Sequence, residues 1–452
     1  MRTILISSFH QLIPRNILFT AIPDLLVDDP QIRLILLVPE NKKQFFVERI
    51  SHERIVIEGV KLGGSTRTLR DRIMGFLAIP LTDTQSLRVL FRGRLVNHKR
   101  RFHYFFYYIP LRTLGRIRLI RACFRRIDAF LASKKRFEQI LNTYNPNLIF
   151  STDVMDKYDA ELIFAGRRKN IRVVSMVRSW DNLTKFGLLR AIPDRLLVWN
   201  DLIQKEAIEY QDVAPEKIRV VGIPHYDRYT HGTRMTREEF FRSLGIDPAK
   251  KLIFFAPTGV PRLFDNNADR VHLGLLKTFN TSIFVRFPPT NPVHLDSHSD
   301  SPHVFFDRPG VVFGQSPKMI DALMDRKDDM LLCNAVYWSD VVVSGPSTIA
   351  LDAAVFAKPL VLVDFSGSST PYLDDAGESY KSIHMQYVVE SGGVRMATSP
   401  DELLNSVREY LSSPLKDAGA RAQLQHSLFG VLDGKACSRM VQALLEKLMM
   451  SK

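Results

Sequence analysis

Short apolar runs rich in β-branched residues recur along the chain and alternate with stretches of helical periodicity. Runs of about four to eight such residues predict buried strands, and strands separated by helices predict a parallel sheet covered on both faces. In the first half we expect strands at 3–8, 32–38, 54–59, 147–152, 171–177, 195–200 and 218–223. In the second half we expect strands at 251–257, 282–287, 303–306, 340–345 and 359–365.

A polar, linker-like stretch near residues 228–240 separates these two sets of strands. The pattern therefore predicts an α/β protein with two doubly wound, Rossmann-like domains that face a central cleft. We expect an N-terminal domain over 1–232 and a C-terminal domain over 240–452. The length of 452 residues fits this division, because a single domain commonly has about 100–200 residues.

Composition indicates a globular chain, with 45% hydrophobic and 24% charged residues. The cysteines Cys123, Cys333 and Cys437 lack metal-binding spacing, which favours reduced thiols in a cytoplasmic protein over disulfides or a zinc site. The N-terminus lacks the apolar core of a signal peptide, and no uninterrupted apolar run reaches about 18 residues. We therefore expect a cytoplasmic protein without a membrane-spanning segment.

The net charge of +14 is concentrated in residues 84–127, which contain many Lys and Arg residues and no Asp or Glu. The same segment includes the aromatic stretch HYFFYYIP at 103–110. Further apolar residues follow at a spacing that predicts one helical face: Leu114, Ile117, Ile120, Phe124, Ile127 and Leu131. We expect five arginines of this segment to contact an acceptor or a membrane: Arg112, Arg116, Arg118, Arg121 and Arg125.

Basic and aromatic side chains beside an amphipathic helix are typical of a peripheral protein on an anionic membrane. A core helix with a solvated basic face is the alternative interpretation. Nucleic-acid binding is disfavoured, because the charge is confined to one insertion-like segment and no nucleic-acid motif occurs elsewhere.

The segment SGPSTIALDAAVFAKPLVLVDF, residues 344–365, has the pattern of a strand end, a turn and a helix. The first turn of a helix presents free backbone N–H groups and the positive end of its dipole, which favour phosphate beyond the carboxyl end of the strand. Gly345 permits close approach of a ligand, and Asp352 is placed to accept hydrogen bonds from ribose hydroxyls. The candidate nucleotide-binding residues are Ser344, Gly345, Pro346, Ser347, Thr348 and Asp352. Helix capping by Ser347 or Thr348 is the alternative.

This segment resembles the nucleotide-binding strand, loop and helix of GT-B fold glycosyltransferases, although many members carry Glu where this chain has Asp352. VVGIPHYD at 220–227 is similar to the VxGxPRxD element of CDP-glycerol glycerophosphotransferases. VRSWDNLTKFG at 177–187 is similar to an SWDNxTxKG stretch of related surface-polysaccharide enzymes. The resemblance covers residues from about 147 to 440, whereas residues 60–130 match no family.

The resemblance implies transfer from a nucleotide sugar, in which an acceptor hydroxyl attacks the anomeric carbon and the nucleoside diphosphate leaves. Arg286, at a strand end where relatives have a KxHP-like sequence, is expected to contact the leaving phosphate; a structural salt bridge is the alternative. His225 and Lys185 are further candidates for phosphate or acceptor contact. The chain has no Asp-x-Asp pair, so we expect neither a metal nor a cofactor besides the nucleotide-sugar substrate.

A general base must lie within hydrogen-bonding reach of the acceptor hydroxyl. Asp181, Asp153 and His10 each follow a predicted strand and are the catalytic candidates, with Arg15 expected on the acceptor side. Asp156 and Asp159, which lie shortly after Asp153, are further candidates for the same role. Acids at such positions also commonly begin helices, which is the alternative interpretation. A transferase that retains the anomeric configuration needs no such base.

Together these features predict a metal-independent GT-B glycosyltransferase at the inner face of the membrane, which uses a nucleotide sugar to build a cell-surface glycan on a glycan or lipid-linked acceptor. Three alternatives stay open. A CDP-glycerol-type glycerophosphotransferase shares VVGIPHYD, and a non-hydrolysing UDP-N-acetylglucosamine 2-epimerase shares the architecture but needs no basic insertion. A non-catalytic basic adaptor would bind no nucleotide.

Overall fold

The structure is a computed structural model that describes residues 1–62, 69–97, 100–132, 135–232, 234–259, 267–293, 295, 303–316, 319–365 and 376–450. Lys99, part of the predicted basic segment, lies outside these residues. Two compact units make up the chain.

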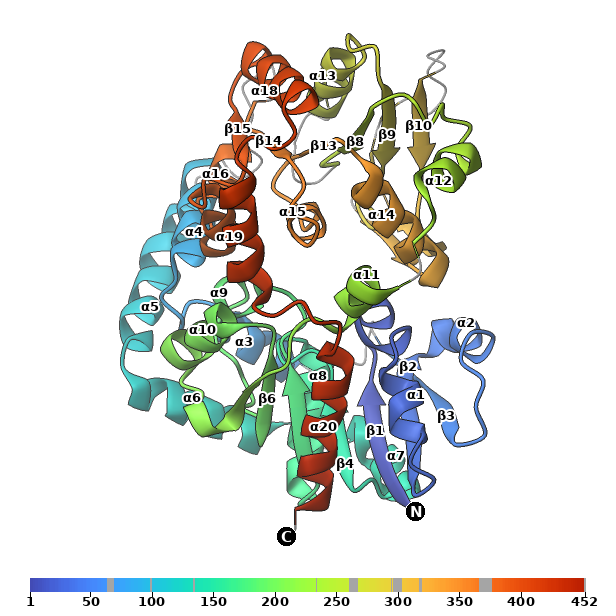
Figure 1. Ribbon diagram of the computed structural model, residues 1–452. Helices are drawn as coiled ribbons and strands as arrows, with labels where there is room; N and C mark the ends of the chain where they lie inside the picture. The colour runs from blue at the N-terminus through green and yellow to red at the C-terminus, as the bar shows by residue number, and fades with distance from the viewer. Residues whose placement is uncertain are drawn as a thin grey trace. The chain divides into compact units, whose positions relative to one another are not determined.

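The first unit comprises Met1–Arg88, Arg101–Thr230 and Leu432–Lys452. Its centre is a parallel sheet of seven strands in the order β3-β2-β1-β4-β5-β6-β7 (Figure 1). The strands are β1 (Arg2–Ser7), β2 (Ile32–Pro39), β3 (Ile55–Val60), β4 (Leu148–Ser151), β5 (Arg172–Met176), β6 (Arg195–Val198) and β7 (Ile218–Val220). Because β1, β4 and β5 are neighbours and parallel, the loops after them meet at one edge of the sheet.

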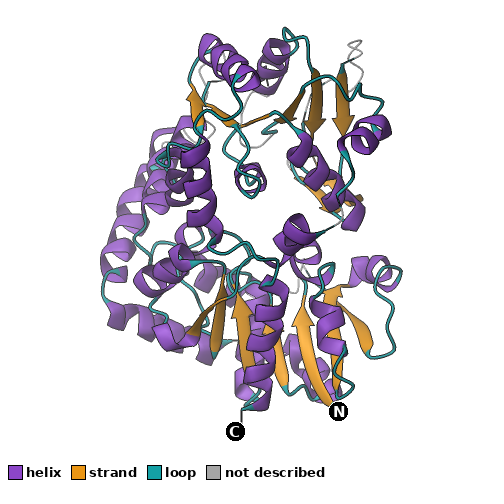
Figure 2. Cartoon of the chain, in the orientation of Figure 1, coloured by secondary structure: helices purple, strands orange, loops and turns teal. Residues whose placement is uncertain are grey.

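Helices cover both faces of this sheet (Figure 2). On one face, α7 (Lys135–Tyr144) and α8 (Lys157–Arg168) pack against strand residues that include Leu5, Ile149 and Val173. On the other face lie α1 (Ile22–Val27) and α20 (Ala436–Met449). Strands covered on both faces are buried along their length, which explains their continuous apolar runs.

The second unit comprises Val89–Arg100 and His231–Val431. Its parallel sheet has the order β10-β9-β8-β13-β14-β15. The strands are β8 (Leu252–Ala256), β9 (Ser282–Arg286), β10 (Val304–Asp307), β13 (Val341–Ser344), β14 (Leu360–Val363) and β15 (Arg395–Ala397). Helices α13 (Asn267–Leu276) and α18 (Pro400–Ser412) pack on one face, and α12 (Arg237–Ser243) and α14 (Arg326–Trp338) pack on the other.

The predicted α/β class with two doubly wound parallel sheets is confirmed. The prediction missed β15, whose three residues form no apolar run, and the antiparallel hairpin of β11 (Val311–Ser316) and β12 (Met319–Leu323). Most of the hairpin's side chains are exposed or half-buried, so its sequence lacks the signal of a buried strand.

The C-terminal helix α20 belongs to the first unit, whereas the predicted boundary assigned 240–452 to one domain. The Asp227 carboxylate accepts hydrogen bonds from the backbone N–H groups of Ala436 (2.9 Å) and Cys437 (2.7 Å), in the first turn of α20. Arg195 of β6 pairs with Glu446 of the same helix at 3.0 Å. A carboxylate at a helix N-terminus is stabilising, so Asp227 of VVGIPHYD anchors α20 to its unit.

The segment between β3 and β4 is helical, and its elements are α3 (Leu69–Ala78), α4 (Gln85–Asn97), the π-helical turn η4 (His103–Tyr108), α5 (Ile109–Gly115) and α6 (Arg118–Leu131). The predicted single apolar face over 114–131 is wrong, because the chain turns between α5 and α6. Gly115 lets the end of α5 approach the backbone of Leu81 closely, since an added Cβ would lie 2.4 Å from the carbonyl oxygen of Leu81. Ile120 and Phe124 pack inward, whereas Ile127 is exposed.

Arginines of this segment bind carboxylates of the first unit. The Arg112 Nε atom lies 2.6 Å from Asp83 Oδ1, and the Arg116 Nη2 atom lies 2.9 Å from Asp83 Oδ2. Burial raises the pKa of Asp83, but hydrogen bonds from Arg88, Arg112 and Arg116 outweigh burial and hold this pKa below its usual range.

A second carboxylate, Asp212, binds arginines of α6. The Arg125 Nη1 atom lies 3.1 Å from Asp212 Oδ2, and Arg121 is paired with the same carboxylate. Arg118 lies 3.6 Å from it, with a side chain that is 79% exposed. The expectation that all five arginines face an acceptor or a membrane is therefore corrected: Arg112, Arg121 and Arg125 hold the helices to the fold.

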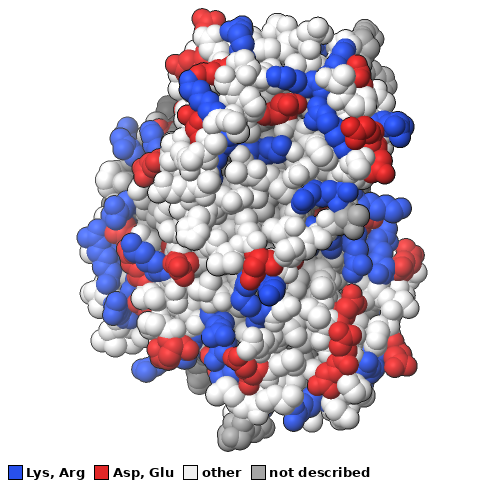
Figure 3. Space-filling view, viewed as in Figure 1, with Lys and Arg blue, Asp and Glu red and all other residues white. Residues whose placement is uncertain are grey.

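The surface shown in Figure 3 carries Lys and Arg side chains interspersed with acidic side chains and broad uncharged areas. Within the part of the chain that the structure describes, no helix is long and apolar enough to span a bilayer.

Candidate functional site

The predicted nucleotide-binding loop follows β13 in the second unit, beside the loop that follows β8. Ser344 at the end of β13 is aligned with Ala256 at the end of β8. The loops after these strands also touch, since a Cβ atom on Gly345 would lie 2.3 Å from the Oγ1 atom of Thr258. Gly345 therefore brings two strand-end loops together, which is a role that the sequence did not indicate.

The residues of this loop differ in exposure. Ser344 is buried and donates its Oγ hydrogen to the Gly345 carbonyl oxygen (3.0 Å). Ser347 is half-buried and accepts a hydrogen bond from the Ile349 N–H group (3.3 Å). Thr348 is exposed and does not cap the helix α15 (Ile349–Ala354). Hydroxyl groups of Ser347 and Thr348 are thus the ones that a ligand can reach first.

Pro346 and Asp352 are both buried, Asp352 within the short helix α15. Asp352 accordingly does not present its carboxylate on an open surface. Its predicted contact with a ribose stays a prediction.

Asp269 on α13 holds the loop after β8, and the sequence analysis missed it. Its carboxylate accepts hydrogen bonds from the backbone N–H groups of Thr258 (2.8 Å) and Gly259 (2.9 Å). Burial raises the pKa of Asp269 to about 6, while the two hydrogen bonds act in the opposite direction. No sequence signal pointed to Asp269, because its two partners lie about ten residues earlier in the chain.

Arg286 ends β9, as predicted, but its guanidinium is buried. It forms an ion pair with Asp307 at the end of β10 and donates a hydrogen bond to the Asp328 carbonyl oxygen (2.9 Å). These contacts match the salt-bridge alternative. A role of Arg286 at a leaving phosphate stays a prediction.

The predicted catalytic residues of the first unit gather at the carboxyl ends of β1, β4 and β5. Asp153 follows β4 and is buried, with its Oδ2 atom 3.0 Å from Nε of Arg178, which follows β5. Burial raises the pKa of Asp153 to about 6, although Arg178 acts to lower it. Arg178 lies within the VRSWDNLTKFG motif and was not recognised as a site residue from sequence.

Asp159 on α8 lies deeper at the same edge of the sheet. One carboxylate oxygen accepts hydrogen bonds from the hydroxyl groups of Ser7 and Ser151, the last residues of β1 and β4. Burial raises the pKa of Asp159 well above its usual value, and the nearby carboxylates of Asp156 and Asp153 raise it further. Asp156 caps α8 through the backbone N–H groups of Tyr158 and Asp159, so these two acids serve the fold.

Asp181 is half-buried and more accessible than Asp153. Its Oδ1 atom accepts a hydrogen bond from the Ser179 hydroxyl (2.8 Å), and its Oδ2 atom lies 3.9 Å from the Lys185 Nζ atom. Among the predicted acids, Asp181 is therefore the carboxylate best placed to meet a substrate.

His10 follows β1 and lies close enough to Arg178, Asp181 and Lys42 for their charges to affect it. Its Nδ1 atom accepts a hydrogen bond from the Leu12 N–H group (3.2 Å). Burial, followed by the charge of Arg178, lowers the pKa of His10 to about 3, so the ring is neutral with its proton on Nε2. His10 can thus donate a hydrogen bond to a substrate through Nε2, and its predicted catalytic role stays a prediction.

His225 lies in the first unit, whereas the predicted nucleotide-binding loop lies in the second. It is buried, and neither ring nitrogen has a hydrogen-bond partner among the described residues. Burial and the charges of Arg15 and Arg228 lower its pKa well below the usual value. Arg15 donates a hydrogen bond to the Tyr229 hydroxyl (3.0 Å), which ties the turn after β1 to the end of the VVGIPHYD region.

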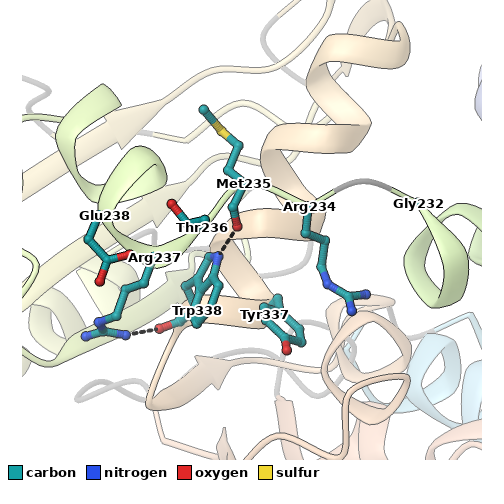
Figure 4. A pocket seen from close by; sticks show the side chains of 8 residues that line it. All are labelled: Gly232, Arg234, Met235, Thr236, Arg237, Glu238, Tyr337 and Trp338. Atoms are coloured by element: carbon teal, nitrogen blue, oxygen red, sulfur yellow. Dashed lines mark hydrogen bonds between the residues drawn. The ribbon is translucent and has the colours of Figure 1, made fainter.

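A surface hollow of about 550 Å³ lies between α12 and the end of α14 (Figure 4). The Trp338 Nε1 atom donates to the Met235 carbonyl oxygen (3.0 Å), and Arg237 donates to the Trp338 carbonyl oxygen (3.1 Å). The Arg234 guanidinium stacks on the Tyr337 ring at 4.3 Å. These groups bind one another, and none belongs to the predicted site.

Comparison with known proteins yields matches by structure. No family model and no curated protein sequence matches the chain. A UDP-GlcNAc 2-epimerase from Neisseria meningitidis, bound to UDP-GlcNAc, superposes with a TM-score of 0.54 at 10% identity, covering 99% of this chain and 100% of that one. A glycosyltransferase from Rickettsia africae gives a TM-score of 0.51 at 10% identity over 100% and 99% of the two chains.

The Arabidopsis thaliana protein UGT89C1, complexed with UDP, gives a TM-score of 0.52 at 9% identity over 99% and 100% of the two chains. At such identities the likeness establishes the fold, which is the GT-B fold of two parallel-sheet units. The predicted fold class is therefore confirmed, whereas the resemblance to the CDP-glycerol group stays a prediction.

Proposed function

We propose that this protein is a metal-independent glycosyltransferase that moves a sugar from a nucleotide sugar to a cell-surface glycan or lipid-linked acceptor. The observation that carries the proposal is the grouping of Asp181, His10 and Arg178 at the carboxyl ends of neighbouring strands in the first unit. Ligands of doubly wound sheets bind at this edge. The group combines an accessible carboxylate, a neutral hydrogen-bond donor and a cation.

The nucleotide-sugar donor is supported by structures of the same fold. The Neisseria epimerase is bound to UDP-GlcNAc, and the Arabidopsis protein is complexed with UDP. In this chain we assign the diphosphate to the loop of Ser347 and Thr348, whose hydroxyl groups are accessible beside the end of β8. Backbone N–H groups and hydroxyls can stabilise charge on a leaving diphosphate without a metal.

In the proposed reaction, the acceptor hydroxyl oxygen attacks the anomeric carbon and the bond from that carbon to the diphosphate breaks. The bonding electrons leave with the nucleoside diphosphate, and Asp181 takes the proton of the acceptor hydroxyl. His10 donates a hydrogen bond to the acceptor through Nε2, because its Nδ1 atom is engaged by Leu12. Arg178 holds Asp153 at 3.0 Å and adds positive charge at the same edge.

A lipid-linked acceptor is presented at a membrane, so we also propose that the protein works at the inner face of the cell membrane. Arg121 and Arg125 bind Asp212 within the fold, so other side chains would have to contact the lipid.

A second candidate is a UDP-N-acetylglucosamine 2-epimerase, which is favoured by the several epimerases among the structural neighbours. An epimerase converts the nucleotide sugar without an acceptor, so product analysis separates the two functions. Purified protein is incubated with UDP-GlcNAc, other nucleotide sugars or CDP-glycerol, with and without soluble and lipid-linked oligosaccharides.

The transferase proposal predicts that nucleotide release and labelling of an oligosaccharide both depend on the acceptor. Formation of the C2 epimer of UDP-GlcNAc without acceptor would overturn the proposal in favour of the epimerase. Transfer of glycerol phosphate from CDP-glycerol would instead identify a glycerophosphotransferase.

A further inference from the structure

Helices of the first unit expose large apolar side chains in the segment between β3 and β4. Phe130 is 86% exposed and Leu119 is 66% exposed, both on α6. On α3, on η4 and on the residue before η4, the exposed apolar side chains are Leu69, Ile73, Phe76, Phe102, Phe105 and Phe106. Monomeric proteins rarely expose apolar side chains in such groups unless these contact a partner.

The exposed side chains lie on helices that pack beside one another. The Phe76 ring of α3 stacks on the Tyr107 ring of η4, with centroids 4.0 Å apart. Arg70 of α3 binds Asp128 of α6. In Figure 1, α5 and α6 run along the left flank of the drawing. The apolar side chains therefore belong to one packed helical layer, which we call the helical layer, residues 69–88 and 101–132.

α6 shows how this layer is oriented. Ile120 and Phe124 pack against Ala78, Leu81 and Leu188 in the interior. Helical spacing groups the exposed residues of the helix on its solvent side: Leu119, Cys123, Arg126, Ile127 and Phe130. The helix thus has an inner apolar face that stabilises the fold and an outer apolar ridge that the fold does not use.

The charges around this ridge have one sign. The only acids in the helical layer, Asp71, Asp83 and Asp128, are buried or paired with arginines of the same unit. Exposed charges on the described residues of the layer are basic, and they include Arg72, Arg101, Arg116, Arg118 and Arg126. Exposed phenylalanines and leucines among exposed cations, with no exposed acid on the described residues of the layer, complement the acyl boundary and phosphate groups of an anionic leaflet.

We infer that the outer face of the helical layer docks on an anionic lipid bilayer, with Leu119 and Phe130 inserted below the phosphates and Arg126 at their level. This inference deepens the proposed function by naming the partner of the acceptor-side unit. The inference does not need that function to hold, because lipid binding is measured without any substrate.

The test is cosedimentation of the full-length protein with phosphatidylcholine vesicles that contain about 30% phosphatidylglycerol. We expect Leu119→Ser combined with Phe130→Ser to lower the partition coefficient by about tenfold or more, because two large apolar side chains no longer leave water. Leu415→Ser is the matched control, since Leu415 is 82% exposed and lies in the second unit, and it should bind as the wild type does.

The cationic contribution is tested with Arg126→Gln, which removes an exposed charge, against Arg326→Gln on α14. The first substitution should lower binding about fivefold at low salt, with a smaller loss at high salt, and the second should leave it unchanged. Neutral phosphatidylcholine vesicles should bind the wild type more weakly than anionic vesicles do.

Vesicle binding that is unchanged in the Leu119→Ser, Phe130→Ser variant would overturn the inference, as would absence of vesicle binding by the wild type. Light scattering tests whether the ridge instead binds a second copy of the chain. A wild-type dimer that becomes a monomer in this variant would assign the ridge to self-association and overturn the inference. Thermal shift by nucleotide in the same variant keeps the proposed function separately testable, because that site lies in the other unit.

Discussion

The carboxylates after strands β4 and β5 differ in what surrounds them. Asp153 forms an ion pair with Arg178, and Asp156 caps the first turn of α8. Asp159 accepts hydrogen bonds from the hydroxyls of Ser7 and Ser151. Asp181 has one oxygen bound to Ser179 and a looser contact with Lys185. The half-buried Asp181 suits proton transfer, whereas the other three acids suit stability.

At residue scale, Asp181→Asn should lower kcat by about 100-fold or more in the transfer assay, because the amide cannot accept the acceptor's proton. Nucleotide affinity should not change, since the assigned loop lies in the other unit. Asp201→Asn, an exposed carboxylate at the start of α10 (Asp201–Gln211), is the control. A kcat within threefold of the wild type would remove Asp181 from the mechanism and favour a retaining reaction.

Asp159 gives a prediction about pH. Burial raises its pKa in the folded state, so its contribution to the free energy of unfolding is fully present below its unfolded pKa of about 4 and is lost as pH rises through the folded value. Asp159→Asn should therefore make the decline of unfolding free energy from pH 5 to 8 shallower in urea titrations. The exposed Glu53→Gln should leave the slope unchanged. A slope equal to that of the wild type in Asp159→Asn would show that Asp159 does not take up this proton.

At the scale of elements, Asp212 fastens α6 by binding two arginines whose side chains are largely buried. Asp212→Asn should lower the free energy of unfolding by about 2–4 kcal/mol, because it leaves Arg121 and Arg125 without their counter-charge. Asn tolerates the left-handed backbone at this position, where φ is 54°, so the turn itself is kept.

Arg118→Gln is the control for this prediction, since that side chain is mostly exposed and lies 3.6 Å from Asp212. It should change stability by less than about 1 kcal/mol in the same chemical denaturation. An Asp212→Asn protein as stable as the Arg118→Gln protein would mean that the ion pairs of α6 do not hold the helical layer in place.

Apart from the short β15, the strands of both sheets were predictable from sequence because buried parallel strands require unbroken apolar runs. The role of the basic segment was not, because Asp83 and Asp212 lie far in sequence from several arginines that they bind. The pattern of an amphipathic helix does not indicate which of two cores its apolar face packs against. The sequence analysis therefore placed α20 in the second domain, whereas it belongs to the first unit.

For the candidate site as well, some residues could be predicted from sequence and others could not. Positions in the loops that follow strands, such as Asp153 and Asp181, could be found because the carboxyl ends of parallel strands meet at one edge. Partners from elsewhere in the chain, such as Asp269 for the loop after β8 and Asp307 for Arg286, depend on tertiary packing. The tautomer of His10 likewise follows from a backbone contact that only the folded turn creates.

For the whole molecule, the central claim is that this GT-B fold binds a nucleotide at the Ser347 and Thr348 loop. Thermal unfolding in the presence of UDP, GDP, CMP, CDP, dTDP or ADP tests the claim most directly. One nucleotide at about a hundred times its Kd should stabilise the native state by about 2.7 kcal/mol, and Ser347→Ala with Thr348→Ala should abolish most of that shift. No shift with any of the six nucleotides, or an equal shift in the double variant, would contradict the account.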